Sequence, residues 1–520
     1  MIYNNIYNFK NPVRFFIDIE NLIFPSNIAT FSIDDLCWSE PLKFRIKKDN
    51  DKYRTLKMPN ILNLVSAYEY YKSLPNFDNP QQLDPDHKRL SPNLDTGDFA
   101  AGEYDIHLEN DFNRLCIYDN LIRIDIKEFY GRLYTHYIDF NSLDERYITN
   151  LNKGATNGLI MGNYLSLYFA EDTLSKISEK ITTEFQNQNI NCKFSYFSDD
   201  FYFFCNTEDN DKVIKIFDNI LEDYGLERSD NKKEIWTYET YNAYNVVTRH
   251  WKRLIATCNI RYNVRIRENK MVFINQLLYR SSKLDNDKLK RVFINNFFKT
   301  KYFRELDLSK FKFKYYDYHQ ICYLLKLSPE ALLYSMDKLS TMRDFKQELI
   351  YNFFKVRYRE SLKKSFYEVQ LYYYYALKLL EYNDIIIENK NLVLISGNQV
   401  LISYYLSEGI FDVSDIAILK TKNTEEFWFQ SYHLILYTND LLLDLENSIE
   451  QYLIPDATKP DTNASSGKLL TKNKRKKSYM DFYKSNLIAN RPIIRDVNNI
   501  CLTINDYLAL KFEEEEALYI

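Results

Sequence analysis

Glycine and proline are scarce in this sequence, and both are unevenly placed. Only 10 of the 520 residues are glycine, yet Gly154, Gly158 and Gly162 lie within nine residues of one another. All 12 prolines lie outside residues 93–328. Because proline is the strongest breaker of regular structure, the middle of the chain can form long helices and strands. The glycine cluster predicts a place where two backbone segments approach closely.

Metal-binding cysteine and histidine patterns are also missing. The seven cysteines are scattered without a CxxC pair, and the six histidines show no ligand spacing. These absences exclude a disulfide scaffold and a zinc centre, and they favour free thiols in a reducing cytoplasm. Any metal ion is therefore expected to be a hard cation held by carboxylates.

The sequence lacks a basic and apolar leader, and it lacks an apolar run of about 18 residues that would span a membrane. We therefore predict a cytoplasmic protein without a membrane partner. The net charge of −4 does not indicate a nucleic-acid binder by bulk electrostatics, so a basic surface must be local. Aromatic residues make up 16% of the chain, with 45 tyrosines.

Two adjacent acids, Asp199 and Asp200, interrupt an aromatic, β-prone stretch from Lys193 to Cys205. This pattern predicts a β-hairpin with the acids at its tip. A polar turn is the simpler interpretation, since aspartate is common in turns. A bound cation is the functional one, because it would neutralise two neighbouring carboxylates.

Asp125 ends a short apolar strand, residues 121–125, and a turn into a helix follows. A helix over 158–180, the acidic hairpin, an amphipathic helix over 209–224 and a strand near Lys232 come next. This order predicts a split βαβ sheet with helices on one face. Such a sheet places Asp125 and Asp199 on neighbouring strands, as a two-metal phosphoryl-transfer site requires.

In residues 42–59, apolar and polar side chains alternate on both sides of a polar turn, which predicts a basic hairpin. Its exposed face is expected to carry Lys43, Arg45, Lys47, Lys52 and Arg54, with Lys57 out of phase. The hairpin is either a solvated surface or a lid that holds a triphosphate. A helix is expected over 63–72, and residues 73–110, rich in Pro, Asp, Asn and Gly, predict a mostly irregular segment.

From about residue 270 the chain has helical apolar spacing, which predicts several stacked helices. The apolar stripes of these helices are expected to form a hydrophobic core, and a groove for single-stranded DNA is the functional alternative. A basic stretch over residues 249–267 would line such a path. We expect three parts: an N-terminal segment with fingers over 1–120, a palm over 121–255 and a helical domain over 256–520.

Four segments in this order resemble the motifs of reverse transcriptases: Asp125–Tyr130, Gly158–Ser166, Phe197–Asp200 and the stretch after Gly225 that bears Lys232. The sequences of residues 129–136, 156–158 and 198–203 resemble still more closely those of the abortive-infection (Abi) polymerases of the AbiK-like or prophage-encoded kind. The resemblance implies an α+β fold with reverse-transcriptase-like fingers and palm, followed by an all-helical, HEAT-like C-terminal domain. It also implies a homo-oligomer, a trimer or hexamer.

The resemblance further implies roles for single residues. Asp125 and Asp199 would bridge two Mg²⁺ ions, which Mn²⁺ could replace, with Asp200 and the Ile126 carbonyl as further support. The remaining roles fall to nine other residues: Lys232 as proton donor to pyrophosphate; Arg54, Lys47 and Lys52 on the dNTP triphosphate; Tyr130, with Phe129 and Gly162, at the nucleotide sugar; and Tyr7 or Tyr3, on the N-terminal segment, as the priming hydroxyl.

Three functions are compatible with these residues. The first is a phage-defence polymerase that adds dNTPs without a template to a protein hydroxyl, which leaves single-stranded DNA covalently attached to the protein. The second is an RNA-templated reverse transcriptase, and the third is a catalytically silent nucleic-acid-binding scaffold. Ile160 and Met161 stand where reverse transcriptases usually have Pro and Gln, which favours the first function over the second.

Overall fold

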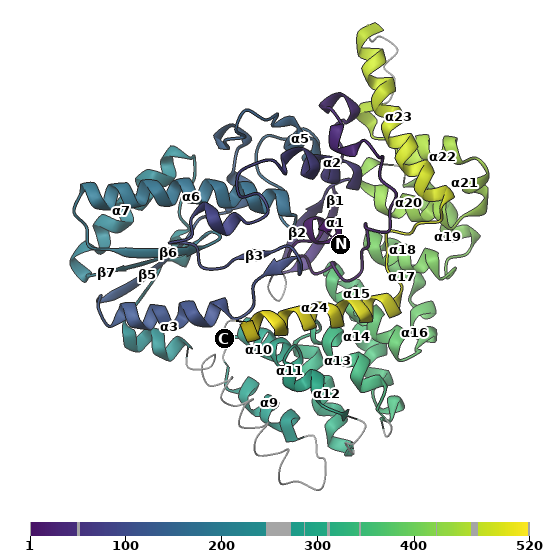
Figure 1. The fold of residues 1–520 in the computed structure, drawn as a ribbon. Helices are drawn as coiled ribbons and strands as arrows, with labels where there is room; N and C mark the ends of the chain where they lie inside the picture. Colours follow the sequence, from purple (N-terminus) through teal and green to yellow (C-terminus); the bar gives the residue numbers. More distant parts are fainter. Residues whose placement is uncertain are drawn as a thin grey trace.

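The computed structural model describes residues 2–48, 52–245, 272–284, 286–308, 313–342, 345–422, 424–458 and 466–517. It is an α+β structure in which a small sheet lies beside a large helical region (Figure 1). The basic stretch expected over 249–267 and the domain boundary expected near residue 255 both lie outside these described residues. One apolar core runs from Ile6 to Leu508 and joins the sheet, the hairpin and the helices.

The sheet is built as the order of motifs predicts. Its four strands are β5 (Asn120–Asp125), β6 (Lys193–Phe197), β7 (Asp200–Cys205) and β8 (Glu234–Trp236). They are arranged in the order β6-β7-β5-β8, and all neighbours are antiparallel. This is the split βαβ arrangement, and it confirms that the acidic hairpin is a direct neighbour of the strand that ends at Asp125.

Two long helices cover one face of this sheet, α6 (Tyr164–Asn187) and α7 (Asn210–Asp223) (Figure 1). Alternate residues of β7 point toward them, and Phe201 and Phe203 are fully buried against Phe217 of α7. The intervening residues Asp200 and Tyr202 therefore belong to the opposite face. The apolar alternation thus fixes which face carries the acids.

The opposite face is partly covered by α3 (Glu103–Leu115) (Figure 1). The prediction of a mostly irregular segment over 73–110 is wrong for this helix. Its residues Leu108, Phe112 and Leu115 form a small separate core with Phe204 and Leu121 of the sheet. Polar composition hid the helix, because only one narrow stripe of it is apolar.

The basic hairpin forms as predicted, from β1 (Leu42–Lys47) and β2 (Tyr53–Met58). The pairing of its strands, however, differs from the expected distribution of basic residues between the two faces. Arg54 pairs with Ile46 and Lys57 pairs with Lys43, so Lys57 shares the face of Lys43, while Arg54 lies on the other face. The alternation does not continue through the turn, and a slip of one position moves a side chain to the other face.

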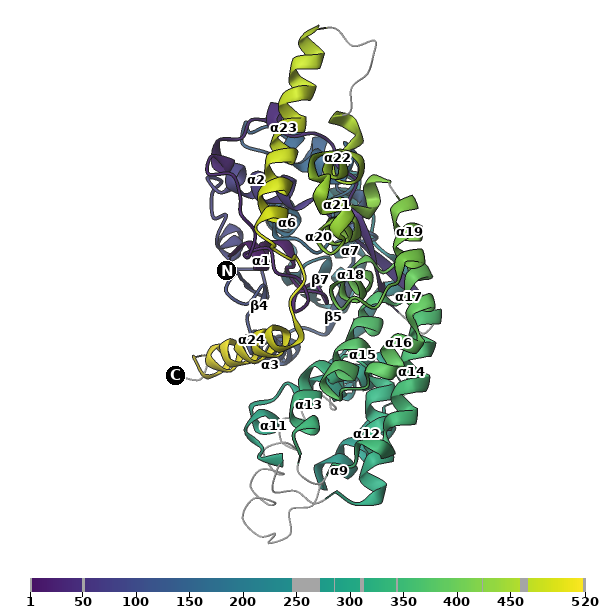
Figure 2. The same cartoon turned by 90° about the vertical axis from the view of Figure 1, so that its right-hand side faces the viewer.

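The second half of the described chain is helical, as predicted (Figure 2). No described helix is both long and apolar enough to cross a bilayer. A HEAT-like repeat remains a prediction. The helices are α9 (Val272–Ser282), α10 (Asp287–Phe298), α11 (Lys301–Glu305), α12 (Tyr315–Leu327), α13 (Ala331–Ser340), α14 (Tyr351–Lys363), α15 (Tyr367–Leu379), α16 (Asn383–Glu388), α17 (Lys390–Ser396), α18 (Gln399–Ser407), α19 (Val413–Thr421), α20 (Trp428–Leu436), α21 (Asn439–Leu443), α22 (Leu445–Tyr452), α23 (Ser466–Ile488) and α24 (Val497–Ala517).

Shorter elements complete the N-terminal half. They are the helices α1 (Ile2–Tyr7), α2 (Ile61–Tyr71), α4 (Phe129–Arg132) and α5 (Arg146–Thr149), and the strands β3 (Pro92–Asn93) and β4 (Asp98–Phe99). The chain between α1 and β1 crosses to the helical region. There the amide of Asp18 donates to Ile493 and the amide of Arg495 donates to Phe16. This N-terminal segment therefore packs against the link between the last two helices.

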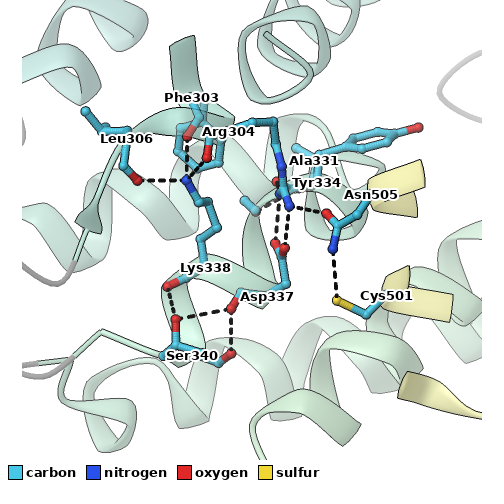
Figure 3. A network of polar contacts seen from close by, with 12 residues as sticks. Phe303, Arg304, Leu306, Ala331, Tyr334, Asp337, Lys338, Ser340, Cys501 and Asn505 are labelled. Carbon is cyan, nitrogen blue, oxygen red and sulfur yellow. Dashed lines mark hydrogen bonds and ion pairs between the residues drawn. The ribbon is translucent and has the colours of Figure 1, made fainter. Parts of the chain in front are cut away.

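The C-terminal helix α24 is tied to the helical region by a polar network (Figure 3). Arg304 donates two hydrogen bonds to Asp337, of 3.2 and 2.7 Å, and another to Asn505 of α24. Lys338 donates to three carbonyls at the end of α11, those of Phe303, Arg304 and Leu306. The two cations thus hold α11, α13 and α24 together, and Lys338 satisfies carbonyls at a helix end.

His433 of α20 is fully buried and gives a pH-dependent prediction. Its Nε2 accepts a hydrogen bond from the Ile493 amide at 3.2 Å, so Nδ1 carries the proton that bonds the Phe429 carbonyl at 2.9 Å. Burial lowers the pKa of this imidazole to about 4. Because the unfolded state binds the proton near pH 6.5, stability is complete above that pH and falls toward pH 4.

The loss from this group is expected to reach about 3 kcal/mol below pH 4, since one pKa unit corresponds to about 1.4 kcal/mol. Urea unfolding between pH 4 and 7.5 measures it. His433→Gln keeps an amide in place of the ring and should remove this part of the pH dependence. Parallel pH profiles for the two proteins would contradict the assignment.

Candidate active site

Three aspartates meet at one end of the sheet. Asp125 is the last residue of β5 and lies directly opposite Asp200, the first residue of β7. Ser198 and Asp199 form the two-residue turn between β6 and β7, with φ of +52° at Ser198. The amide of Ile126 donates to the carbonyl of Asp199 at 2.9 Å. The turn and the strand end are therefore bonded together, as predicted.

Asp125 is 7% exposed, and its two carboxylate oxygens differ. Oδ2 accepts a hydrogen bond from Lys232 Nζ at 2.5 Å. Oδ1 is buried and has no hydrogen-bond partner. A buried carboxylate oxygen without a donor is costly, and a cation at this point would offset the cost. The residues present thus fit a divalent metal ion at Asp125.

Asp199 is surrounded by negative charge. Burial raises the pKa of its carboxyl group, and the charges of Asp125 and Asp200 raise it further. Lys232 acts in the opposite direction. Repulsion between neighbouring carboxylates is the same condition that makes a site attract a cation. Asp125, Asp199 and Lys232 therefore form one electrostatic unit.

Asp200 belongs to a different arrangement. Arg123 donates two hydrogen bonds to its carboxylate, from Nε to Oδ1 at 3.1 Å and from Nη2 to Oδ2 at 2.8 Å. Within the described residues no group of three or more His, Cys, Asp or Glu side chains is arranged to hold a metal ion. Asp200 is thus neutralised by Arg123, whereas Asp125 and Asp199 are not paired with an arginine.

Sequence reasoning missed Arg123, although its position could have been found. It lies two residues before Asp125 on the same strand, so the two share one face of the sheet. Arg123 also lies 3.4 Å from Glu234 of β8. A further cation, Lys10, lies over the rings of Phe197 and Phe99, beside the hairpin tip. No sequence signal pointed to Lys10, because its contacts arise from the tertiary fold.

The glycine cluster packs against the segment that follows Asp125. The amide of Leu159 donates to the Tyr130 carbonyl at 2.7 Å, and the Gly158 amide donates to Leu133 at 3.1 Å. A Cβ on Gly158 would lie 2.8 Å from the Gly131 carbonyl oxygen. Burial raises the pKa of the Tyr130 hydroxyl, and the charges of Glu171 and Asp199 raise it further. Tyr130 thus lies close to the hairpin tip.

Gly158→Ala is expected to destabilise the protein more than a second glycine substitution. Gly158 has φ of +89° and touches backbone, whereas Gly409 has φ of +63° and open space around its Cβ position. Gly409→Ala should cost about 1–2 kcal/mol from backbone conformation alone. Gly158→Ala should cost about 1–3 kcal/mol more from overpacking. Urea unfolding compares the two, and equal losses would contradict the close approach.

The residues expected to bind the nucleotide do not all lie on one face of the β1–β2 hairpin. Arg54 is exposed and contacts the sulfur of Met161 at 3.5 Å, next to Gly162 with φ of +105°. Lys52, directly before β2, is exposed. Lys47 lies on the opposite face, with its amide bonded to Glu368 of α15. Phe129 is 1% exposed in the core, so its side chain is not at the surface.

Tyr7 and Tyr3, which are expected to offer the priming hydroxyl, lie on helix α1, and both hydroxyls are hydrogen-bonded. Tyr7 is 2% exposed, and its hydroxyl donates to the Pro59 carbonyl at 2.9 Å. The Tyr3 hydroxyl donates to Glu69 at 2.9 Å. Burial raises the pKa of both hydroxyls. Helix α1 is packed because its apolar residues fill the core, and neither hydroxyl is free to reach the aspartates.

The C-terminal helix supports the candidate site from a distance. Tyr507 of α24 donates to Asp98 at 3.0 Å, and Lys511 donates to the Phe99 carbonyl. Phe99 in turn packs edge-on against Phe197, with ring centroids 5.0 Å apart. Phe197 is the last residue of β6 before the acidic turn. The last helix and the acidic hairpin are therefore linked through β4.

Comparisons with known proteins add little to this geometry. No family of known proteins matches the chain, and no curated protein matches it. Among solved structures, the chain is similar to telomerase from Candida albicans in a complex with a fragment of telomeric RNA, with 12% identity and a TM-score of 0.30 over 81% of this chain and 68% of that one. A likeness this weak carries no argument about function, which therefore rests on the site itself.

Proposed function

We propose that this protein is a nucleotidyl polymerase with its active site at Asp125 and Asp199. One observation carries the proposal: Asp125, whose carboxylate has a buried oxygen without a partner, ends a strand that is bonded to the acidic turn through the Ile126 amide and the Asp199 carbonyl. A scaffold would gain nothing from such a pair, because mutual repulsion and burial both disfavour it. The glycine-bearing loop beside the acids is the second support.

The residues of the chain divide the work of such a reaction. Asp125 and Asp199 would hold two divalent ions, which lower the pKa of an attacking hydroxyl and neutralise the leaving pyrophosphate when bound. Lys232 is half exposed and is paired with Asp125, and in this proposal it would give a proton to pyrophosphate. Arg123 holds Asp200 in place, and Arg54, which contacts Met161, would bind a triphosphate.

In its finer form we propose a protein-primed polymerase that adds dNTPs without a template and acts in defence against phage as a homo-oligomer. The support is the sequence resemblance and the presence of Ile160 and Met161, both of which lack the polar contact of a templated enzyme. The hydroxyls of Tyr7 and Tyr3 are both hydrogen-bonded, so priming from either residue would require helix α1 to move.

One experiment separates the three candidate functions. Purified protein is incubated with Mg²⁺ and labelled dNTPs, with no nucleic acid added. Label that stays with the protein in denaturing gels supports protein priming, and mass spectrometry of the labelled peptide then identifies the residue. Incorporation only with an added template and primer indicates a reverse transcriptase. No incorporation under either condition would overturn the proposed polymerase.

A further inference from the structure

A polar pocket lies on the face of the β1–β2 hairpin opposite Arg54. Its wall is formed by the end of β1, the end of α12, α14 and the start of α15, and it includes Lys47, Lys326, Arg357 and Lys364. The pocket has a volume of about 100 Å³. Pockets that bury a drug-sized ligand usually measure about 300–1,000 Å³, so this one suits a small group.

The charge of this pocket is strongly one-sided. Four cationic side chains line it together with a single carboxylate, Glu360, which is bonded to Lys363 at 3.0 Å. None of the four cations lies within 4.0 Å of a carboxylate in the part of the chain that the structure describes. Burial lowers the pKa of Lys47, and the positive charges of Arg291 and Lys364 lower it further. The carboxylates of Glu368 and Asp287 act on Lys47 in the opposite direction. The cations of the pocket still outnumber its carboxylates, and an excess of cations attracts an anion.

Buried polar atoms in the pocket wall also lack partners. Tyr373 is 1% exposed, and its hydroxyl has no hydrogen-bond partner. The Nε of Arg357 is likewise buried and unpaired. Burial raises the pKa of Tyr373 to about 12, although the charge of Arg357 and a weak side-chain interaction of its guanidinium with the hydroxyl both act against it. Both groups are donors, and an unpaired buried donor costs about 1–3 kcal/mol.

We propose that this pocket binds a phosphate group of a nucleotide or of a nucleic-acid strand. Arg357 offers a planar fork and the three lysines offer point charges, which together suit phosphate oxygens. The Tyr373 hydroxyl is a neutral donor at the base of the same site. The small volume admits the phosphate and leaves the sugar and base outside. This binding does not require the three aspartates, so it stands apart from the proposed reaction.

The test measures binding to the full chain in EDTA, which prevents turnover. The pocket variant is Arg357→Gln with Lys364→Gln, and the control is Lys355→Gln with Lys378→Gln, which removes two cations paired with Glu388 and Glu408. Fluorescence anisotropy follows a labelled oligothymidylate, and calorimetry follows dTTP. The pocket variant should weaken binding of at least one probe about tenfold, since bonds to charged groups are the strong ones.

Each outcome decides the proposal. Weaker binding of the oligonucleotide alone identifies strand phosphates as the ligand, and weaker binding of dTTP identifies a nucleotide. Equal affinities in pocket and control variants for both probes overturn the proposal. Removing like charges should leave the melting temperature unchanged or raise it. If the double variant does not fold, Lys364→Gln alone, at an exposed position, gives the same comparison.

Discussion

Replacing Asp199 with asparagine is expected to abolish nucleotide incorporation without destabilising the protein. The amide that replaces the carboxylate lacks the charge that holds a divalent ion, and ions in such sites contribute several kcal/mol to the transition state. A loss of at least about 10³-fold follows, because each 1.4 kcal/mol is a factor of about ten. Incorporation of labelled dNTPs with Mg²⁺ measures this effect.

The stability of the same variant gives an independent check. Burial and the charges of Asp125 and Asp200 raise the pKa of Asp199, so its ionised form destabilises the folded state at pH 7. Asp199→Asn should therefore leave the free energy of unfolding unchanged or increase it. Asp209→Asn is a control, because Asp209 is a partly buried aspartate at the start of α7 that is paired with Lys212 at 3.0 Å. Activity retained in Asp199→Asn would refute the catalytic pair.

Asp111→Ala is expected to be the most destabilising change in the sheet region. Asp111 is 1% exposed and bonds both end nitrogens of Arg89, at 3.0 and 2.6 Å, as well as the Tyr241 hydroxyl at 2.8 Å. Arg89 is itself buried and stacks on the ring of Tyr202 at 3.6 Å. Removing the acid leaves an uncompensated buried charge, which costs about 3–5 kcal/mol.

An exposed ion pair provides the comparison. Glu227 is paired with Lys127 at 2.6 Å, and both side chains are about half exposed. Glu227 also contacts Arg132 at 2.8 Å. Glu227→Gln should leave the free energy of unfolding nearly unchanged, because exposed ion pairs contribute little to stability. Guanidinium unfolding, followed by tyrosine and tryptophan fluorescence, measures both variants. Similar small losses in the two would show that Arg89 finds solvent or another partner and that α3 is not held by this pair.

The fold of the sheet could be predicted because its signals are local. Alternating apolar residues define β7, and a two-residue turn with adjacent acids defines the hairpin tip. Asp125 follows from the same reasoning, since it ends a short strand in which apolar residues flank a single arginine. The β1–β2 hairpin was also predicted, but its register was not. The turn decides register, and an error of one residue reverses the faces of Lys57 and Arg54.

The candidate site was predicted only in part, for the same reason. Asp125, Asp199 and Lys232 were placed together by motif order, and the structure joins them. Arg123 was overlooked although its position on β5 was known. Lys10 and Lys47 depend on contacts with segments far along the chain, which no local pattern contains. The packed Tyr7 shows that a chain end is mobile only where it has no core to fill.

The sequence by itself determined the strands, the acidic turn and the helical character of the second half, because periodicity and turn chemistry act over a few neighbouring residues. Tertiary structure alone decided that Arg123 forms an ion pair with Asp200 and that α3 covers part of the sheet. It also decided that Lys47 lies beside α15 rather than beside the aspartates. Those outcomes depend on which distant surfaces bury one another. Burial is a property of the whole chain, and the residues that share a pocket are known only once it has folded.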